Sequence, residues 1–281
     1  MSFRFLHAAD IHLDSPLHGL QRYDGAPVDA IRQSARTALK RLVDLALAER
    51  VAFVLIAGDL YDGDWRDYNT GLFFIAQAQR LADAGIPLYL IAGNHDAQNV
   101  MTKALVLPQQ TTFLAADRSE TVYLEDLGVA IHGQSFATRA VTHDLSAAYP
   151  AGQRGLFNIG MLHTSAGCEG HDNYAPCTLD GLRSRQYQYW ALGHVHQRGI
   201  LCEDPIVTFP GNIQGRHIKE SGPKGCWLVT VDDRQAATVS FRPLDVLRWD
   251  RATVSIEDVR HEDDLWPLIA SALEKHEQSH G

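Results

Sequence analysis

The feature that most constrains the fold of this chain is a repeated pattern of apolar runs that end in polar residues of metal-binding type. The five motifs carry Asp10 and His12, then Asp59, then Asn94 and His95, then His163, and finally His194 and His196. Side chains that follow the carboxyl ends of neighbouring strands meet at one edge of an open α/β sheet. The pattern therefore predicts an α/β fold in which these side chains converge.

Helix and strand patterns alternate in the first hundred residues. Residues 3–8, 52–57 and 88–92 are short apolar runs, typical of strands that are covered on both faces. Residues 29–49 and 72–84 place apolar side chains at helical spacing. Further strand patterns follow at residues 122–124, 129–132, 157–162, 189–192, 206–209, 226–231 and 237–242. Together they predict two packed mixed β-sheets flanked by helices.

The segment after residue 245 has a different character. Val254 and Ile256 begin a strand-like alternation, and residues 263–275 have the spacing of an amphipathic helix with an acidic start. We therefore expect residues 1–245 to form the main domain and residues 246–281 to begin a second, incomplete one.

Composition limits the class of protein. Hydrophobic residues make up 45% of the 281 residues and charged residues 21%, which is a normal balance for a globular chain. The formal net charge of −9 argues against a uniformly basic surface for nucleic acid. No apolar stretch has the length of a membrane span, and the four cysteines show no CxxC spacing. We expect reduced thiols and a cytoplasmic location, with no membrane partner.

The candidate ligands are two carboxylates, one amide and four imidazoles. Asp59 is the natural bridge, because one carboxylate can join two cations about 3.5–4 Å apart. One cation would take Asp10, His12, Asp59 and His196. The other would take Asp59, Asn94, His163 and His194. This mixture favours Mn²⁺, Zn²⁺ or Fe²⁺ over Ca²⁺ or Mg²⁺, and we expect two Mn²⁺ ions.

Such a pair of cations is suited to hydrolysing a phosphate ester with a metal-activated water. His95 stands beside a ligand but outside the ligand set. It would protonate the leaving alkoxide or stabilise the charge on the phosphoryl group. His95 is therefore the candidate catalytic residue.

Other polar residues are interpreted as structural or solvent-exposed. The histidines in this class are His7, His18, His132, His143, His171, His261, His276 and His280. The basic residues Arg183, Arg185, Arg216, His217, Lys219 and Lys224 are interpreted as a solvated face. A cysteine nucleophile at Cys168 would leave the other candidate ligands unexplained, and no Gly-x-Ser-x-Gly motif occurs.

The ordered motifs resemble those of the calcineurin-like metallophosphoesterase superfamily. That pattern is Asp-x-His, Gly-Asp, Gly-Asn-His-Asp/Glu, His and Gly-His-x-His, and all of it is present between residues 10 and 196. Within the superfamily the chain looks most like the Mre11/SbcD DNA repair nucleases, and more closely like bacterial YhaO-type proteins. This finer resemblance rests on His-Ala-Ala-Asp-Ile-His-Leu-Asp-Ser-Pro-Leu, Gly-Asp-Leu-Tyr-Asp, Ala-Leu-Gly-His-Val-His and Pro-Gly-Asn-Ile-Gln-Gly-Arg.

The resemblance implies a manganese-dependent DNA exonuclease or endonuclease that works with an SbcC/Rad50-like coiled-coil ATPase. It implies a calcineurin-like phosphoesterase sandwich over residues 1–245, followed by a capping domain. A homodimer is a further expectation. Related proteins often carry a histidine three residues after the bridging aspartate, where this chain has Asp62. A role for that histidine in positioning a DNA strand is therefore not carried over.

Two other functions stay open at this point. The acidic net charge slightly favours a phosphodiesterase for a small molecule such as a cyclic nucleotide. A non-catalytic scaffold on the same fold would be expected to have lost some ligands, yet every ligand position is filled.

Overall fold

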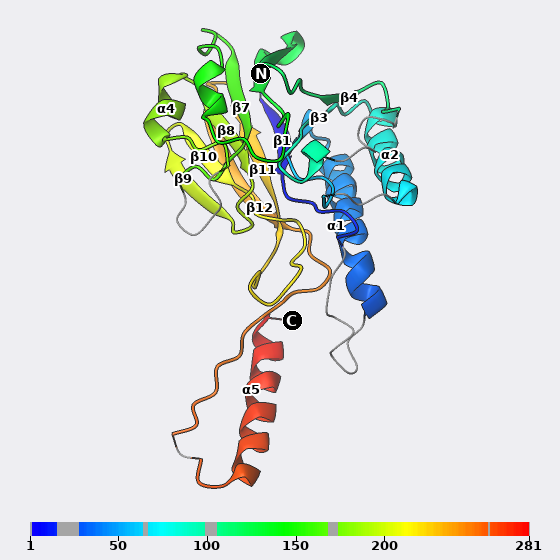
Figure 1. Ribbon diagram of the computed structural model, residues 1–281, viewed down its shortest axis with the longest axis vertical. Coiled ribbons are helices and arrows are strands. Elements are labelled where there is room, and N and C mark those ends of the chain that lie inside the picture. Colours follow the sequence, from blue (N-terminus) through cyan, green and yellow to red (C-terminus); the bar gives the residue numbers. More distant parts are fainter. Residues whose placement is uncertain are drawn as a thin grey trace.

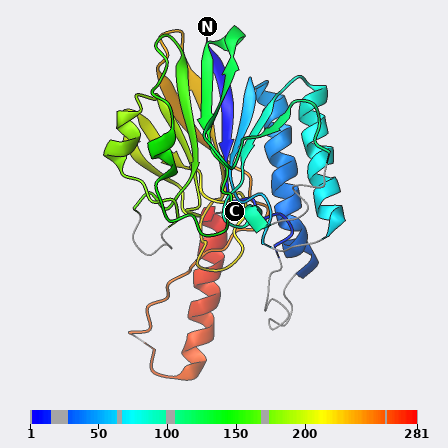
Figure 2. The ribbon, with the colours of Figure 1, turned by 45° about the horizontal axis from the view of Figure 1, so that its top comes forward.

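Two β-sheets of six strands each pack face to face, and helices lie on their outer faces (Figures 1 and 2). The computed structural model describes residues 2–15, 28–63, 67–98, 106–167, 174–257 and 259–280. Three residues discussed in the sequence analysis lie outside the described residues, namely His18, Cys168 and His171. The predicted fold class, two packed mixed sheets flanked by helices, is confirmed.

The first sheet has the order β12-β11-β1-β2-β3-β4. Its strands are β1 (Phe3–Ala8), β2 (Phe53–Ala57), β3 (Leu88–Ile91), β4 (Thr111–Phe113), β11 (Gly225–Val231) and β12 (Ala237–Pro243). Strands β1 to β4 run parallel, and β11 pairs antiparallel with both β1 and β12. All five residues of β2 are buried, as the continuous apolar run predicts for a central parallel strand.

The second sheet has the order β5-β6-β7-β8-β10-β9. Its strands are β5 (Glu120–Leu124), β6 (Val129–Gly133), β7 (Phe157–His163), β8 (Tyr189–Gly193), β9 (Gly199–Glu203) and β10 (Ile206–Phe209). Strands β6, β7, β8 and β10 are parallel, with β5 and β9 antiparallel at the two edges. The short strands β4 and β9 were not predicted from the sequence.

Aromatic side chains fill the space between the two sheets. The Phe5 ring stacks on Phe53 with 4.9 Å between centroids and meets Tyr189 of the opposite sheet edge-on at 5.3 Å. His7 also links the sheets, because its Nδ1 lies 2.9 Å from Tyr189 Oη and its Nε2 lies 3.1 Å from Leu192 O. Burial lowers the pKa of His7 to about 3, so its ring is neutral. The interpretation of His7 as structural is confirmed.

Helices cover the outer faces. Helices α1 (Val28–Glu49) and α2 (Tyr68–Asp83) lie on the first sheet, and the short α4 (Leu179–Ser184) lies beside the second (Figure 1). Helix α2 begins four residues earlier than its apolar pattern predicts. Asp67 caps it by accepting a hydrogen bond from Asn69 N, which stabilises the first turn.

The C-terminal segment leaves the sandwich after β12. Trp249 still donates from Nε1 to Gly215 O on the body of the molecule. Helix α5 (Leu265–His280) then lies apart from the sheets, with Trp266 71% exposed (Figures 1 and 2). The strand expected around Val254 and Ile256 is absent from the described residues 250–257. Alternating apolar residues do not make a strand without a neighbour to accept their backbone hydrogen bonds.

Among the described residues, no helix combines the length and the apolar character needed to cross a membrane.

Candidate metal centre

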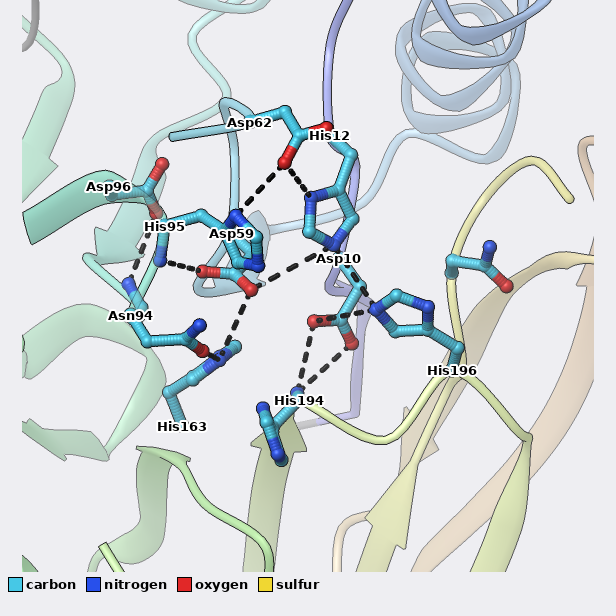
Figure 3. A network of polar contacts seen from close by, with 12 residues as sticks. Asp10, His12, Asp59, Asp62, Asn94, His95, Asp96, His163, His194 and His196 are labelled. Carbon is cyan, nitrogen blue, oxygen red and sulfur yellow. Dashed lines mark hydrogen bonds and ion pairs between the residues drawn. The ribbon is translucent and has the colours of Figure 1, made fainter. Parts of the chain in front are cut away.

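The loops after five strands bring the predicted site residues to one edge of the sandwich (Figure 3). Strand β1 leads to Asp10 and His12, β2 to Asp59, β3 to Asn94 and His95, β7 ends at His163, and β8 leads to His194 and His196. Because β1, β2 and β3 are mutually parallel, as are β7 and β8, each set presents its carboxyl ends together. All eight predicted residues therefore lie in one cluster.

Asp10, His12 and His196 form what we call the first ligand group. His12 Nε2 lies 3.1 Å from His196 Nε2. Asp10 Oδ1 lies 3.9 Å from the same His196 nitrogen. Two imidazole nitrogens that face each other at this distance can share a cation. A metal ion about 2.0–2.1 Å from each nitrogen would fit between them.

Asn94, His163 and His194 form the second ligand group. His163 Nδ1 donates to the carbonyl oxygen of Ala57 over 3.0 Å. Its Nε2 lies 3.0 Å from Asn94 Oδ1 and 3.4 Å from Asp59 Oδ2. The His194 ring packs edge-on against His163, with 5.2 Å between centroids. His163 Nε2, Asn94 Oδ1 and Asp59 Oδ2 therefore converge at a point where a cation would bind.

Asp59 stands between the two groups (Figure 3). Its Oδ2 lies 3.8 Å from His12 Nε2 in the first group and 3.4 Å from His163 Nε2 in the second. Its Oδ1 accepts a hydrogen bond of 2.9 Å from the backbone N–H of His95. This is the position required of a bridging carboxylate, and the donor set as a whole fits a pair of divalent cations.

The buried charges of the centre compensate one another. Burial alone would raise the pKa of Asp59, but His163, followed by His12 and His95, holds it well below its usual range. Burial would likewise lower the pKa of His163, and Asp59 overrides this and raises it to about 9. The pKa of His12 falls to about 3 through burial and the nearby Arg216. A bound cation would take the place of the positive charge that His163 otherwise supplies beside Asp59.

The backbone of these loops does not continue the extended strands. On an extended strand end, Asp10 and His12 would share a face, because they are two residues apart. Both have left-handed backbone conformations, with φ of 51° and 45°, and Asp59 has φ of 51°. Such conformations in residues other than glycine cost about 1–3 kcal/mol each and cluster at functional sites. The turns, rather than strand alternation, aim both side chains into the centre.

Glycines allow the loops to approach closely. A Cβ atom on Gly93 would overlap Asp59 Oδ1 and the His163 ring. A Cβ atom on Gly58 would overlap the His163 ring from another side. The Gly-Asp and Gly-Asn motifs thus leave the room in which the ligands meet.

Asp62 is a site residue whose position the sequence did not predict. Its Oδ1 accepts a hydrogen bond of 2.9 Å from His95 Nδ1 and lies 3.7 Å from His12 Nδ1. The hydrogen bond to Asp62, more than any other contact, raises the pKa of His95. In the sequence Asp62 was noted only as the place where related proteins have histidine, although its spacing from Asp59 was the available signal.

Asp96 holds two of the loops together and was also missed. Its carboxylate accepts hydrogen bonds from Leu60 N at 3.1 Å, Tyr61 N at 2.8 Å and Gly93 N at 3.1 Å. Burial, and then the charge of Asp59, raises the pKa of Asp96 to about 7. Its presence in the Gly-Asn-His-Asp motif was a signal, but the motif alone did not distinguish a ligand from a structural group.

A cavity of about 630 Å³ opens over the centre. Asp59, Asn94, His95, His194 and His196 lie on its lining, together with the cationic side chains Arg139, Arg216, Lys219 and Lys224 and with Tyr174, His217 and Glu220. The interpretation of the basic residues as a solvated face therefore holds only in part. Arg183 lies in α4 and Arg185 directly follows it. The other four basic residues of that set line the cavity, namely Arg216, His217, Lys219 and Lys224.

Comparisons with known proteins give one family match and several relatives. The family model described as calcineurin-like phosphoesterase matches residues 3–198. The metallophosphoesterase YhaO of Bacillus subtilis, which is described as uncharacterized, is 36% identical over 96% of this chain and 67% of its own length. The DNA double-strand break repair protein Mre11 of Sulfurisphaera tokodaii is 25% identical over 92% of this chain and 67% of its own.

Among solved structures, a dimetal phosphatase from Danio rerio has a similar fold. Its TM-score is 0.51 at 13% identity, and the match covers 88% of this chain and 99% of that one. At this level the likeness concerns the fold alone. The family match and the YhaO relative lead to one conclusion: the chain belongs to the calcineurin-like phosphoesterase family.

Proposed function

We propose that this chain is a two-metal phosphodiesterase that cleaves DNA, as an exonuclease, an endonuclease or both. The observation that carries the hydrolytic part is the position of Asp59 between two groups of nitrogen and oxygen ligands. Family membership implies a metal-dependent hydrolase. The choice of DNA as substrate is our own inference.

Two divalent cations, when bound, would supply an acidic water and neutralise the charge of the phosphoryl group. Asp10, His12, Asp59 and His196 would hold one, and Asp59, Asn94, His163 and His194 the other. We propose Mn²⁺ as the metal, with Zn²⁺ or Fe²⁺ as the alternatives, because imidazole nitrogens are mixed with carboxylate oxygens.

His95 is placed to transfer a proton to the leaving group. Its Nδ1 is engaged by Asp62, so the other ring nitrogen is the one available to a substrate in the cavity. Asp62 also orients the ring and raises its pKa, which favours the protonated form that a general acid needs. His95 thus acts on the leaving alkoxide and Asp62 positions it.

The choice of DNA rests on the cavity wall and on the relatives. Arg139, Arg216, Lys219 and Lys224 line the cavity of a chain whose net charge is −9, so positive charge is concentrated where a polyanion would enter. Several archaeal relatives are DNA double-strand break repair proteins by name. A chain of phosphates would use more of this wall than a single small diester.

The test is a substrate panel in Mn²⁺ that contains bis-p-nitrophenyl phosphate, 2′,3′-cyclic nucleotides, and single- and double-stranded DNA. We expect turnover of the activated diester and of single-stranded DNA. Rapid hydrolysis of cyclic nucleotides with intact DNA would replace DNA by a small diester as substrate. Stoichiometric metal binding with no hydrolysis of any substrate would favour the scaffold alternative.

The partner and location are also proposals. We propose that an SbcC/Rad50-like coiled-coil ATPase works with this chain, in the cytoplasm, and that the chain forms a homodimer. Co-purification with the ATPase and the mass of the complex in solution test both interactions.

A further inference from the structure

A buried carboxylate outside both ligand groups contacts the first of them. Glu220 lies in the loop between β10 and β11, and its residue is only 7% exposed. Its Oε1 lies 2.6 Å from His196 Nδ1. Its Oε2 accepts hydrogen bonds from Asn212 Nδ2 at 2.9 Å and from the backbone N–H of Arg216 at 2.7 Å. The loop thus folds around Glu220, and Glu220 in turn holds His196.

This contact determines which nitrogen of His196 is available. A carboxylate can only accept, so His196 Nδ1 must carry the hydrogen. With that tautomer of the imidazole, Nε2 presents a lone pair toward His12 and Asp10, which is the arrangement that a metal ligand requires. The contact with Glu220 favours one orientation and one tautomer of the ring before any metal binds.

The same loop contacts His196 at its backbone. Lys224 Nζ donates to His196 O over 3.0 Å, and Gly211 lies so close that a Cβ atom there would overlap that oxygen. Arg216 extends from the loop to Asp62, with 3.7 Å between NH1 and Oδ2. One loop therefore contacts both the first ligand group and the partner of His95.

We propose that Glu220 is a positioning residue of the metal centre, which fixes the tautomer and orientation of His196 and links the 211–224 loop to metal binding. The inference rests on the proposed function in one respect, namely that His196 is a metal ligand. Removing a carboxylate that orients a histidine ligand typically weakens metal affinity by about 10–100-fold.

A double-mutant cycle with Mn²⁺ as the probe separates positioning from general support of the loop. Metal-free wild type, Glu220→Gln, His196→Asn and the double variant are titrated by calorimetry. We expect Glu220→Gln to weaken one of the two Mn²⁺ sites by about 10–100-fold and to have no further effect once His196 is replaced. An equal loss in both backgrounds, or no loss in either, would overturn the proposal.

A matched control and a second readout complete the test. Ile218→Ala changes an exposed side chain of the same loop, and its Mn²⁺ affinities should equal those of wild type. A long-range ¹H–¹⁵N spectrum of metal-free wild type needs no variant to fold. It should show His196 with its hydrogen on Nδ1, and a hydrogen on Nε2 alone would contradict the proposal. Neither measurement uses DNA, so a missing nuclease activity bears only on the proposed function.

Discussion

His163 contacts Asp59 in the second ligand group, and His196 contacts Asp10 and His12 in the first, but the molecule holds the two rings by different means. His163 ends strand β7, has no exposed surface and donates from Nδ1 to the backbone of β2. His196 lies on a loop after β8, its side chain is 22% exposed, and its Nδ1 contacts the side chain of Glu220. One ligand is fixed by the sheets and the other by a loop that also lines the cavity.

This difference between His163 and His196 indicates which parts of the metal centre are rigid and which can respond to a substrate. His163 belongs to a core strand, so its position changes only if the sheets change. His196 depends on the 211–224 loop, which a substrate in the cavity would contact. We therefore expect His163 to be rigid and His196 to respond to substrate and to mutation of the loop.

The largest effect is expected from replacing Asp59, the residue that both ligand groups share. Asp59→Asn should abolish the binding of both cations and reduce turnover to background, because the bridge no longer neutralises two positive charges. Metal content is measured by mass spectrometry after gel filtration. Two tightly held metals in this variant would remove Asp59 from the bridge.

The second prediction separates chemistry from metal binding. His95→Ala should keep both cations and lower kcat on DNA by roughly 10²–10⁴-fold, the usual contribution of a general acid. The loss should be smaller for bis-p-nitrophenyl phosphate, because p-nitrophenolate leaves without a proton. An equal loss on both substrates would contradict the acid role, and metal analysis of the same samples serves as the control.

The third prediction compares the two histidines directly in metal-free protein. His163→Ala should lower the free energy of unfolding by about 1–3 kcal/mol, because the buried Ala57 carbonyl loses its donor. His196→Ala should lower it less, since Glu220 retains Asn212 and Arg216 as donors. Denaturant unfolding in EDTA measures both. A larger loss for His196→Ala would reverse the comparison.

The smallest expected effect concerns the cavity wall next to the first group. A chain of net charge −9 offers few lysines and arginines to duplex DNA, so we expect weak duplex binding by this chain alone. Lys219→Ala should weaken single-stranded DNA binding modestly and reduce the salt slope by roughly 0.7. Fluorescence anisotropy at several salt concentrations is the measurement. Submicromolar duplex binding at physiological salt would contradict the expectation that this chain alone binds duplex DNA weakly.

Much of the site was predictable because its ligands follow the carboxyl ends of buried strands. Asp59, Asn94 and His163 each stand at the end of a buried apolar run, so sequence position alone placed them at one sheet edge. Periodicity predicted α1 in the same way, because a helix that covers a sheet must present one apolar face.

The rest depended on contacts that sequence patterns do not encode. Glu220 follows no motif, and only the folded loop brings it to His196. The left-handed turns at Asp10 and His12 arise from pairing with the loop after β2, where Asp10 N donates to Gly58 O and His12 N to Asp59 O. The strand expected at residues 254–256 was wrong for the opposite reason: its pattern is regular, but no strand among the described residues pairs with it.

The most direct test of the account is a crystal structure of the Mn²⁺-soaked protein with anomalous data collected at the manganese edge. The account predicts two anomalous peaks about 3.5–4 Å apart, with Asp59 between them, His163 on one and His196 on the other. A single peak, or two peaks that do not share Asp59, would contradict the central claim that this edge of the sandwich holds a bridged metal pair.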